Sequence, residues 1–166
     1  MAVPTARAEV ASPATVVRVV DGDTVEAQLA DGREVPVRLI GIDAAEVSPA
    51  ECGADEATES LRELVEGRPV NLVSDPTQDP VDQSGRNLAY VDRLDGLDVG
   101  EAQLGRGWGE VFVFERGFER QGTYVEAEAE AIDLSRGGWR LCGGDFLDLS
   151  MGGPKVRAHA TGSFRA

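Results

Sequence analysis

Three short strand patterns joined by two tight turns open the chain, and they restrict its fold more than any other feature. Residues 15–20 form a β-branched run, and residues 24–29 and 34–40 alternate between apolar and polar side chains. Such runs are typical of strands. Asp21-Gly22-Asp23 separates the first pair of runs, and Asp31-Gly32, a strong hairpin signal, separates the second. We therefore expect an antiparallel meander at the start of the fold.

Further strand and helix patterns follow the meander. In chain order they are helix 54–66, strand 70–73, strand 88–91, helix 99–104, extended segment 111–114 and helix 121–136, the last closed by Gly137-Gly138. Pro36 indicates that the third strand is partly an edge strand or bulged. Five strands with an early meander, followed by helices, predict a β-dominated α+β fold. Its expected architecture is a five-stranded Greek-key barrel of the OB-fold type with about three helices.

The length of 166 residues predicts one domain with flexible ends. We expect a flexible N-terminal segment at 1–14, the folded domain at 15–142, and a disordered C-terminal tail at 143–166, where periodicity is lost. No stretch approaches the roughly 18 apolar residues that span a bilayer, so no membrane partner is expected. We expect the chain to be a monomer.

The net charge of −14 arises from 30 acidic and 16 basic residues. This sign opposes binding to a polyanion, because Lys and Arg usually supply most of the affinity for nucleic-acid phosphates. One interpretation is a solvated acidic surface that serves solubility or a high-salt habitat. The other is that a local field binds the substrate, since a bound divalent cation and two clustered arginines reverse the sign locally.

The two cysteines, Cys52 and Cys142, lie far apart in the sequence, which excludes the usual spacing of a zinc site. A disulfide between them would close a long loop and stabilise the fold by roughly 4 kcal/mol. It would favour an exported or secreted protein, because disulfides persist in oxidising compartments. The alternative is two small buried thiols in a cytosolic chain.

Three carboxylates and two guanidinium groups lie on strand ends and turns. Asp23 and Asp43 each follow a glycine-containing turn, and paired strands would bring these oxygen ligands to one hard cation. Arg38 sits mid-strand among apolar neighbours and Arg86 follows a glycine turn, where planar forks suit phosphate. Glu46 is placed to act as a general base. The alternatives are ordinary turn aspartates and structural ion pairs.

Several of these residues fall in motifs that occur in a fixed order. The motifs are Val20–Thr24 (VDGDT), Val37–Asp43 (VRLIGID) with Glu46, Gly53–Ala57 (GADEA) and Gly85–Val91 (GRNLAYV). In this order they resemble the staphylococcal nuclease-like (thermonuclease) family over roughly residues 15–142. The resemblance implies an OB-type barrel with three helices. It also implies a nuclease that cleaves DNA and RNA, requires Ca²⁺ and leaves 3′-phosphate ends.

The resemblance also assigns roles to individual residues. Three would hold Ca²⁺: Asp23, Asp43 and the carbonyl of Ala44. Three would act on the phosphate: Glu46 by activating the attacking water, and Arg38 and Arg86 by binding the phosphate and the transition state. All five catalytic side chains are present, which distinguishes this chain from degenerate family members.

The sequence also departs from the family pattern. Ala45 stands where proline is frequent, Gln83-Ser84 replaces a Lys-Tyr pair, and Phe112 and Phe114 stand near positions of two tyrosines. We expect Ser84, Phe112 and Phe114 to contact the substrate, DNA or RNA. With the acidic charge, these departures leave one alternative open, a non-catalytic module of the same fold that binds nucleic acid or protein.

Overall fold

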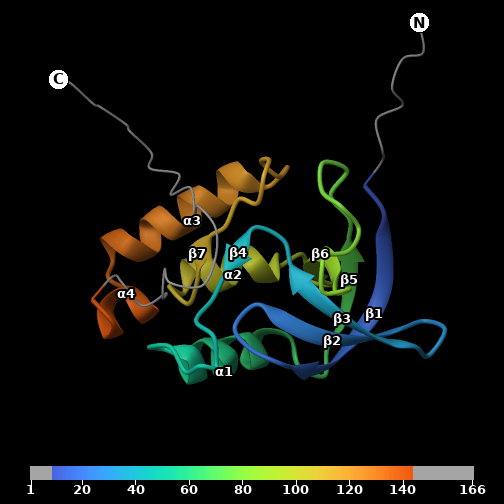
Figure 1. Ribbon diagram of the computed structural model, residues 1–166, viewed down its shortest axis with the longest axis horizontal. Helices are drawn as coiled ribbons and strands as arrows, with labels where there is room; N and C mark the ends of the chain where they lie inside the picture. Colours follow the sequence, from blue (N-terminus) through green and yellow to red (C-terminus); the bar gives the residue numbers. More distant parts are fainter. Residues whose placement is uncertain (1–8, 144–166) are drawn as a thin grey trace, which may run out of the picture.

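Five strands form a closed barrel in a computed structural model that describes residues 9–143 (Figure 1). The strand order around the barrel is β1-β2-β3-β6-β5. The bounds of these strands are β1 Ala11–Val19, β2 Thr24–Leu29, β3 Glu34–Leu39, β5 Pro69–Val73 and β6 Asn87–Arg93. All neighbours pair antiparallel except β3 and β6, which run parallel. The predicted β-dominated α+β barrel is therefore confirmed.

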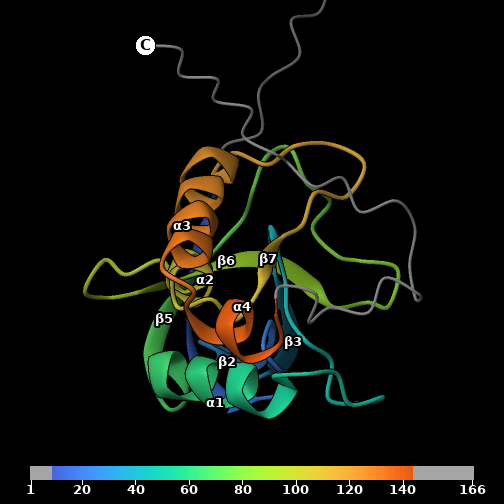
Figure 2. The same cartoon turned by 90° about the vertical axis from the view of Figure 1, so that its left-hand side faces the viewer.

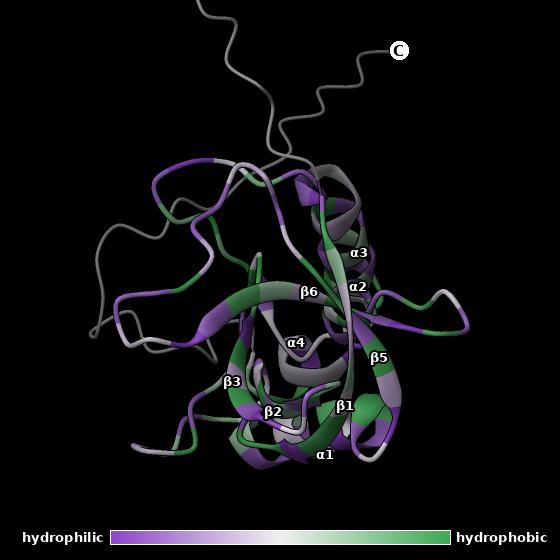
Figure 3. Cartoon of the chain, turned by 90° about the vertical axis from the view of Figure 1, so that its right-hand side faces the viewer, coloured by the Kyte–Doolittle hydropathy of each residue, from purple (hydrophilic) through white to green (hydrophobic). Residues whose placement is uncertain are grey.

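The barrel interior follows from the alternation of side chains along strands such as β3, where Figure 3 shows hydrophobic and hydrophilic residues in turn. Val16, Val25 and Val37 are fully buried and belong to one continuous core. The ladder between β1 and β2 shifts register between Val16 and Arg18, which is a bulge. Pro36 pairs only with β2, because the parallel ladder to β6 begins one residue later. Its missing N–H thus costs no ladder bond.

Four helices cover one side of the barrel (Figure 2). Their bounds are α1 Ala54–Val65, α2 Val99–Gly105, α3 Gln121–Asp133 and α4 Gly137–Leu141. The short α2 contacts α1, α3 and β6, so it is the central helix of this layer. Asp98 caps α2 by accepting a hydrogen bond from the Glu101 amide at 3.1 Å. None of the helices in residues 9–143 is long and apolar enough to cross a membrane.

The segment after β3 is held in position by a second sheet, which has two strands. It consists of β4 (Ile42–Asp43) and β7 (Glu110–Val111), with Asp43 opposite Glu110. The predicted extended segment 111–114 is a strand only at its start. The Phe112 amide donates to the Gly41 carbonyl at 2.9 Å, which continues the contact between the two segments. This small sheet holds Asp43 at the edge of the barrel.

Two predicted boundaries are wrong. The first strand begins at Ala11 rather than residue 15, and Ala11 pairs with Val73 of β5. The third helix ends at Asp133 rather than residue 136, and Gly137 opens α4 instead of only closing α3. The predicted tail at 143–166 lies outside the described residues from position 144 onward.

The predicted disulfide between Cys52 and Cys142 is present. It joins the residue two positions before α1 to the C-cap of α4. Beside it, buried Ala45 and Ala54 pack with Trp139 and Cys142 in a small hydrophobic cluster. The disulfide therefore anchors the loop between β4 and α1 to the C-terminal helix.

Candidate active site

A cleft of about 460 Å³ lies where β3, the small sheet and the loop before β6 meet. It gathers most of the residues singled out in the sequence: Arg38, Asp43, Glu46, Ser84, Arg86, Phe112 and Phe114. Asp23 and Ala44 are buried directly behind its wall. The structure thus brings together all of the predicted metal, catalytic and substrate residues, while their roles stay predictions.

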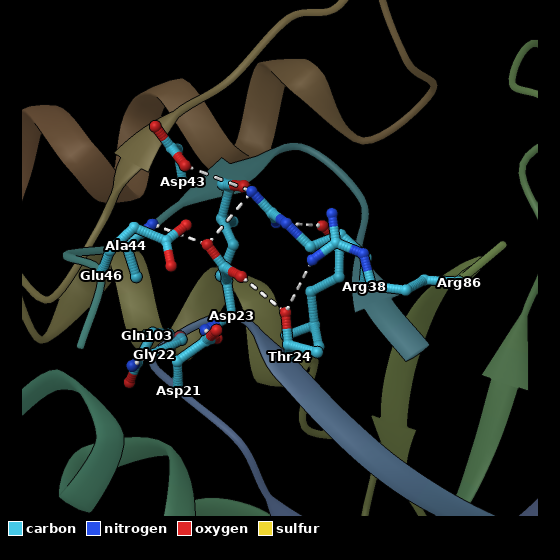
Figure 4. Close-up of polar contacts among 12 residues, drawn as sticks. Asp21, Gly22, Asp23, Thr24, Arg38, Asp43, Ala44, Glu46, Arg86 and Gln103 are labelled. Atoms are coloured by element: carbon cyan, nitrogen blue, oxygen red, sulfur yellow. Dashed lines mark hydrogen bonds and ion pairs between the residues drawn. The ribbon is translucent and has the colours of Figure 1, made fainter. Parts of the chain in front are cut away.

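The two aspartates converge on one guanidinium group (Figure 4). Arg38 Nη2 lies 3.1 Å from Asp23 Oδ2 and 3.2 Å from Asp43 Oδ1. Strand pairing explains this approach, because Thr24, next to Asp23, is the β2 partner of Arg38. The Arg38 Nη1 atom donates to the Leu39 and Ile42 carbonyls at 3.0 and 2.7 Å. These bonds fold the segment after β3 over the arginine and leave its side chain 13% exposed.

Asp23 is the most enclosed carboxylate of the site, with 2% of its surface exposed. Its Oδ2 accepts the Ala44 amide at 2.8 Å and its Oδ1 accepts the Thr24 hydroxyl at 2.9 Å. Burial raises the pKa of Asp23 to about 7, against the opposing charge of Arg38 and with further help from the negative charge of Asp21. Any added positive charge beside Asp23 would therefore stabilise its ionised form.

Glu46 lies at the open side of the cleft, with its carboxylate turned toward the aspartates (Figure 4). Partial loss of water raises its pKa above the usual range, and the negative charge of Asp21 adds to the shift, while Arg38 opposes it. A carboxylate with a raised pKa is a stronger base at neutral pH than an ordinary one. Glu46 thus has the position and the basicity to accept a proton from a water molecule.

The loop that carries Glu46 has Ala45 where proline is frequent in the family, so other contacts restrict its backbone. The Glu46 amide donates to the Glu51 carboxylate at 2.7 Å, and the Glu51 amide donates to the Glu46 carbonyl at 2.9 Å. Ala45 is buried against α1 and the disulfide-linked α4. Packing and two reciprocal hydrogen bonds therefore restrict the loop in place of a fixed φ angle.

Arg86 reaches the site from a turn that Asp82 organises. Asp82 Oδ1 accepts the Ser84 and Arg86 amides, each at 2.9 Å, and Oδ2 accepts Arg86 Nε at 2.7 Å. The Nη1 atom of Arg86 extends to the Thr24 hydroxyl at 3.5 Å. Because Thr24 also pairs with Arg38, the two guanidinium groups lie next to each other, as Figure 4 shows. Such paired forks suit the oxygens of one phosphate.

Two aromatic rings line part of the cleft wall. Phe112 and Phe114 stack with ring centroids 6.4 Å apart, and Phe114 is 56% exposed. Exposed ring faces stack on nucleobases without reading their sequence. Ser84 lines the same cleft, with its amide already bound by Asp82. The wall has the chemistry of a base-stacking surface without phenolic hydroxyl groups.

The donor set fits a hard cation. It offers the carboxylates of Asp23 and Asp43 and the backbone of Ala44, all oxygen ligands of the kind that Ca²⁺ prefers. No group of three His, Cys, Asp or Glu side chains in the described residues is spaced to hold a metal. A cation bound here would therefore complete its shell with water or substrate oxygens. It would also replace the charge that Arg38 supplies to both aspartates.

Several residues near the site were not predicted, and three of them hold predicted site residues or their turns in place. Asp21 is 9% exposed and accepts the Asp23 amide at 3.0 Å. The sequence could have indicated this contact, because Asp21 and Asp23 belong to the same turn. Asp82 lies four residues before Arg86, a spacing that suits an ion pair but has no specific pattern. Gln103 of α2 donates to the Gly22 carbonyl, and nothing in its local sequence indicates this contact.

Comparison with known proteins gives the family. No curated protein matches the chain. The family model described as staphylococcal nuclease homologue matches residues 36–140, which is more than half of the chain. The matched range contains Arg38, Asp43, Glu46 and Arg86, whereas Asp23 precedes it. The barrel, the site and this match together show that the chain belongs to the staphylococcal nuclease homologue family.

Proposed function

We propose that this protein is a Ca²⁺-dependent nuclease that hydrolyses phosphodiester bonds of DNA or RNA and leaves 3′-phosphate ends. One observation carries the proposal: two arginines, Asp43 and a glutamate with a raised pKa line one cleft, and Asp23 lies behind its wall in contact with Arg38. Membership of the nuclease family supports it. Each of these residues has a separate task in the reaction.

Glu46 takes a proton from a water molecule, whose oxygen attacks the phosphorus atom. General-base help of this kind is worth typically about 10²–10⁴-fold in rate. The bond from phosphorus to the 5′-oxygen breaks, the 5′-oxygen takes a proton from solvent water and leaves as a hydroxyl group, and the phosphate stays on the 3′ side. The raised pKa of Glu46 suits this step, because its carboxylate binds a proton more tightly than an ordinary one.

Arg38 and Arg86 bind the phosphate oxygens and stabilise the charge that grows on them in the transition state. Both are held for this purpose. Backbone carbonyls fix Arg38, and the Asp82 carboxylate fixes Nε of Arg86. Fixed donors cost little reorganisation when the charge develops.

The charge balance of the cleft explains why a cation is needed. Its lining contains three arginines and five carboxylates: Arg38, Arg86 and Arg116 against Asp43, Glu46, Asp79, Asp82 and Glu115. A phosphate therefore enters a site with an excess of negative charge. Ca²⁺, when bound by Asp23, Asp43 and the Ala44 carbonyl, would supply positive charge to the phosphate oxygens.

The test is cleavage of labelled DNA and RNA oligonucleotides with Ca²⁺, Mg²⁺ or a chelator, with the product ends identified by mass spectrometry. We expect cleavage with Ca²⁺, 3′-phosphate products and no cleavage with the chelator. Glu46→Gln should lower turnover by about 100-fold or more. Glu34→Gln, a matched change of an exposed glutamate on β3, should leave turnover unchanged. Binding without cleavage under all conditions would instead identify a non-catalytic module.

We also propose that the protein works in an oxidising compartment. The Cys52–Cys142 disulfide supports this, since disulfides persist where thiols are not continually reduced. Thiol titration of the unfolded protein, purified from its native source under alkylating conditions, should find no free thiol. Two reactive thiols would contradict the proposal.

A further inference from the structure

We propose that Gln103, a buried side chain of α2, positions the turn of Asp21, Gly22 and Asp23 for cation binding. The inference rests on the proposed function, because it assigns the cation to Asp23. Gln103 is fully buried. Its Nε2 donates to the Gly22 carbonyl at 3.0 Å and to the Ala57 carbonyl at 2.8 Å, and its Oε1 accepts the Ser60 hydroxyl at 2.8 Å. Both of its donor hydrogens are thus used.

These bonds connect the turn to two helices. Gly22 lies between Asp21 and Asp23 in the turn, and Figure 4 shows Gln103 directly beside it. Ala57 belongs to α1, whereas Gln103 belongs to α2. The barrel holds the other side of the turn, where the Leu39 amide donates to the Asp23 carbonyl at 2.9 Å. The turn is therefore fixed from two directions, and Gln103 supplies the fixation from the helical layer.

The turn also touches Ala44, another expected cation ligand. A Cβ atom placed on Gly22 would lie 2.5 Å from the Cβ of Ala44 and 2.9 Å from that of Ala57. The Ala44 amide in turn donates to Asp23 Oδ2. A displacement of Gly22 would thus be transmitted to Asp23 and to Ala44 at once. Gln103 acts on the ligands through the backbone and touches neither cation nor substrate.

Packing alone would favour an apolar side chain at position 103, because this position is fully buried. Its buried neighbours on α2, Val99 and Leu104, are apolar members of the core. An apolar side chain would fill the space but leave the Gly22 carbonyl without this donor. Groups that orient metal ligands typically change metal affinity by about 10- to 100-fold when they are removed. This magnitude is the expected contribution of Gln103.

The test compares Gln103→Leu and Gln103→Met with Ser60→Ala. The first two remove both carbonyl hydrogen bonds, whereas the third keeps them and removes the Ser60 hydroxyl, which donates to Gln103 and accepts from Arg106 Nη1 at 3.4 Å. Titration calorimetry with Ca²⁺ alone measures affinity, and hydrogen exchange measures the Asp23 and Thr24 amides. We expect about 10-fold weaker Ca²⁺ binding and faster exchange in the Gln103 variants. Wild-type values are expected for Ser60→Ala.

The outcomes separate this inference from the function on which it rests. Wild-type protein that binds no Ca²⁺ would overturn both. Wild-type binding that is unchanged in folded Gln103 variants would overturn only the positioning role, as would equal losses in Ser60→Ala. If neither Gln103 variant folds, hydrogen exchange of the wild-type protein with and without Ca²⁺ tests the inference instead. By linkage, Ca²⁺ must then slow exchange of the Gln103 side-chain amide more than that of β5 amides, and equal slowing would refute the inference.

Discussion

Substitution of Gly22 by alanine tests whether the turn and the cation ligands behave as one packed unit. The added Cβ would lie 2.5 Å from the Cβ of Ala44 and 2.9 Å from that of Ala57. Both of these atoms are fixed directly to the backbone, so no side-chain rotation relieves the contact. Either the turn or the Ala44 segment must move.

The size of the movement follows from the contact distance. Ordinary van der Waals contact begins at 3.4 Å, so the Ala44 contact is too short by about 0.9 Å. Overpacking of this kind costs about 1–3 kcal/mol of unfolding free energy. A misplacement of about 1 Å at reacting groups costs on the order of 100-fold in rate. We therefore expect Gly22→Ala to be folded, less stable and about 100-fold slower.

Urea unfolding and oligonucleotide cleavage with saturating Ca²⁺ measure the two effects separately. Gly32→Ala is the control. Its φ of 87° makes alanine unfavourable, but no atom lies within 4 Å of the added Cβ, and the residue is in the hairpin away from the cleft. It should lose about 1 kcal/mol of stability and no activity. Full activity of Gly22→Ala would refute the reasoning, as would an equal loss of activity in Gly32→Ala.

Two further predictions concern pH and the disulfide. Because the pKa of Asp23 is raised to about 7 in the folded state, the Ca²⁺-free protein should lose stability, relative to Asp23→Asn, as the pH rises from about 4 through 7. Urea unfolding across that range measures it, and a rise in relative stability would contradict it. Reduction of Cys52–Cys142, which are 90 positions apart, should lower the unfolding free energy by about 4 kcal/mol. Urea unfolding with and without reductant measures this, and equal midpoints would contradict it.

The strands were predictable where local pattern and tertiary environment agree. Residues 24–29 alternate, and the observed β2 has the same bounds. Residues 11–14 carry no strand pattern, but they pair with β5, and Ala14 also pairs with Leu29 of β2. Residues 121–136 are rich in alanine and glutamate, which favours a helix, but Ser135 adopts a positive φ of 49° and the chain turns there into α4. Propensity is a weak guide at such ends, because packing overrides it.

The predicted site residues were identifiable because their chemistry is unusual for their positions. An arginine within an apolar strand and aspartates after glycine turns are visible in the sequence. The supporting residues were not. Asp82 is an ordinary residue for a polar loop, and Gln103 is an ordinary residue for a short helix. Asp82 binds the side chain of nearby Arg86, whereas Gln103 binds the backbone of Gly22, far away in the sequence. No local pattern specifies which carbonyl a buried amide will meet.

The sequence by itself determined the β-dominated class, the aspartate, glutamate and arginine side chains of the predicted site, and the acidic net charge. These depend on residue type and on short-range spacing. Only the tertiary structure decided which groups meet. Arg86 reaches Thr24 across 62 positions and Gln103 reaches Gly22 across 81. Closure of the barrel and packing of α2 create these contacts, because burial of a shared core fixes distances that the order of residues leaves open.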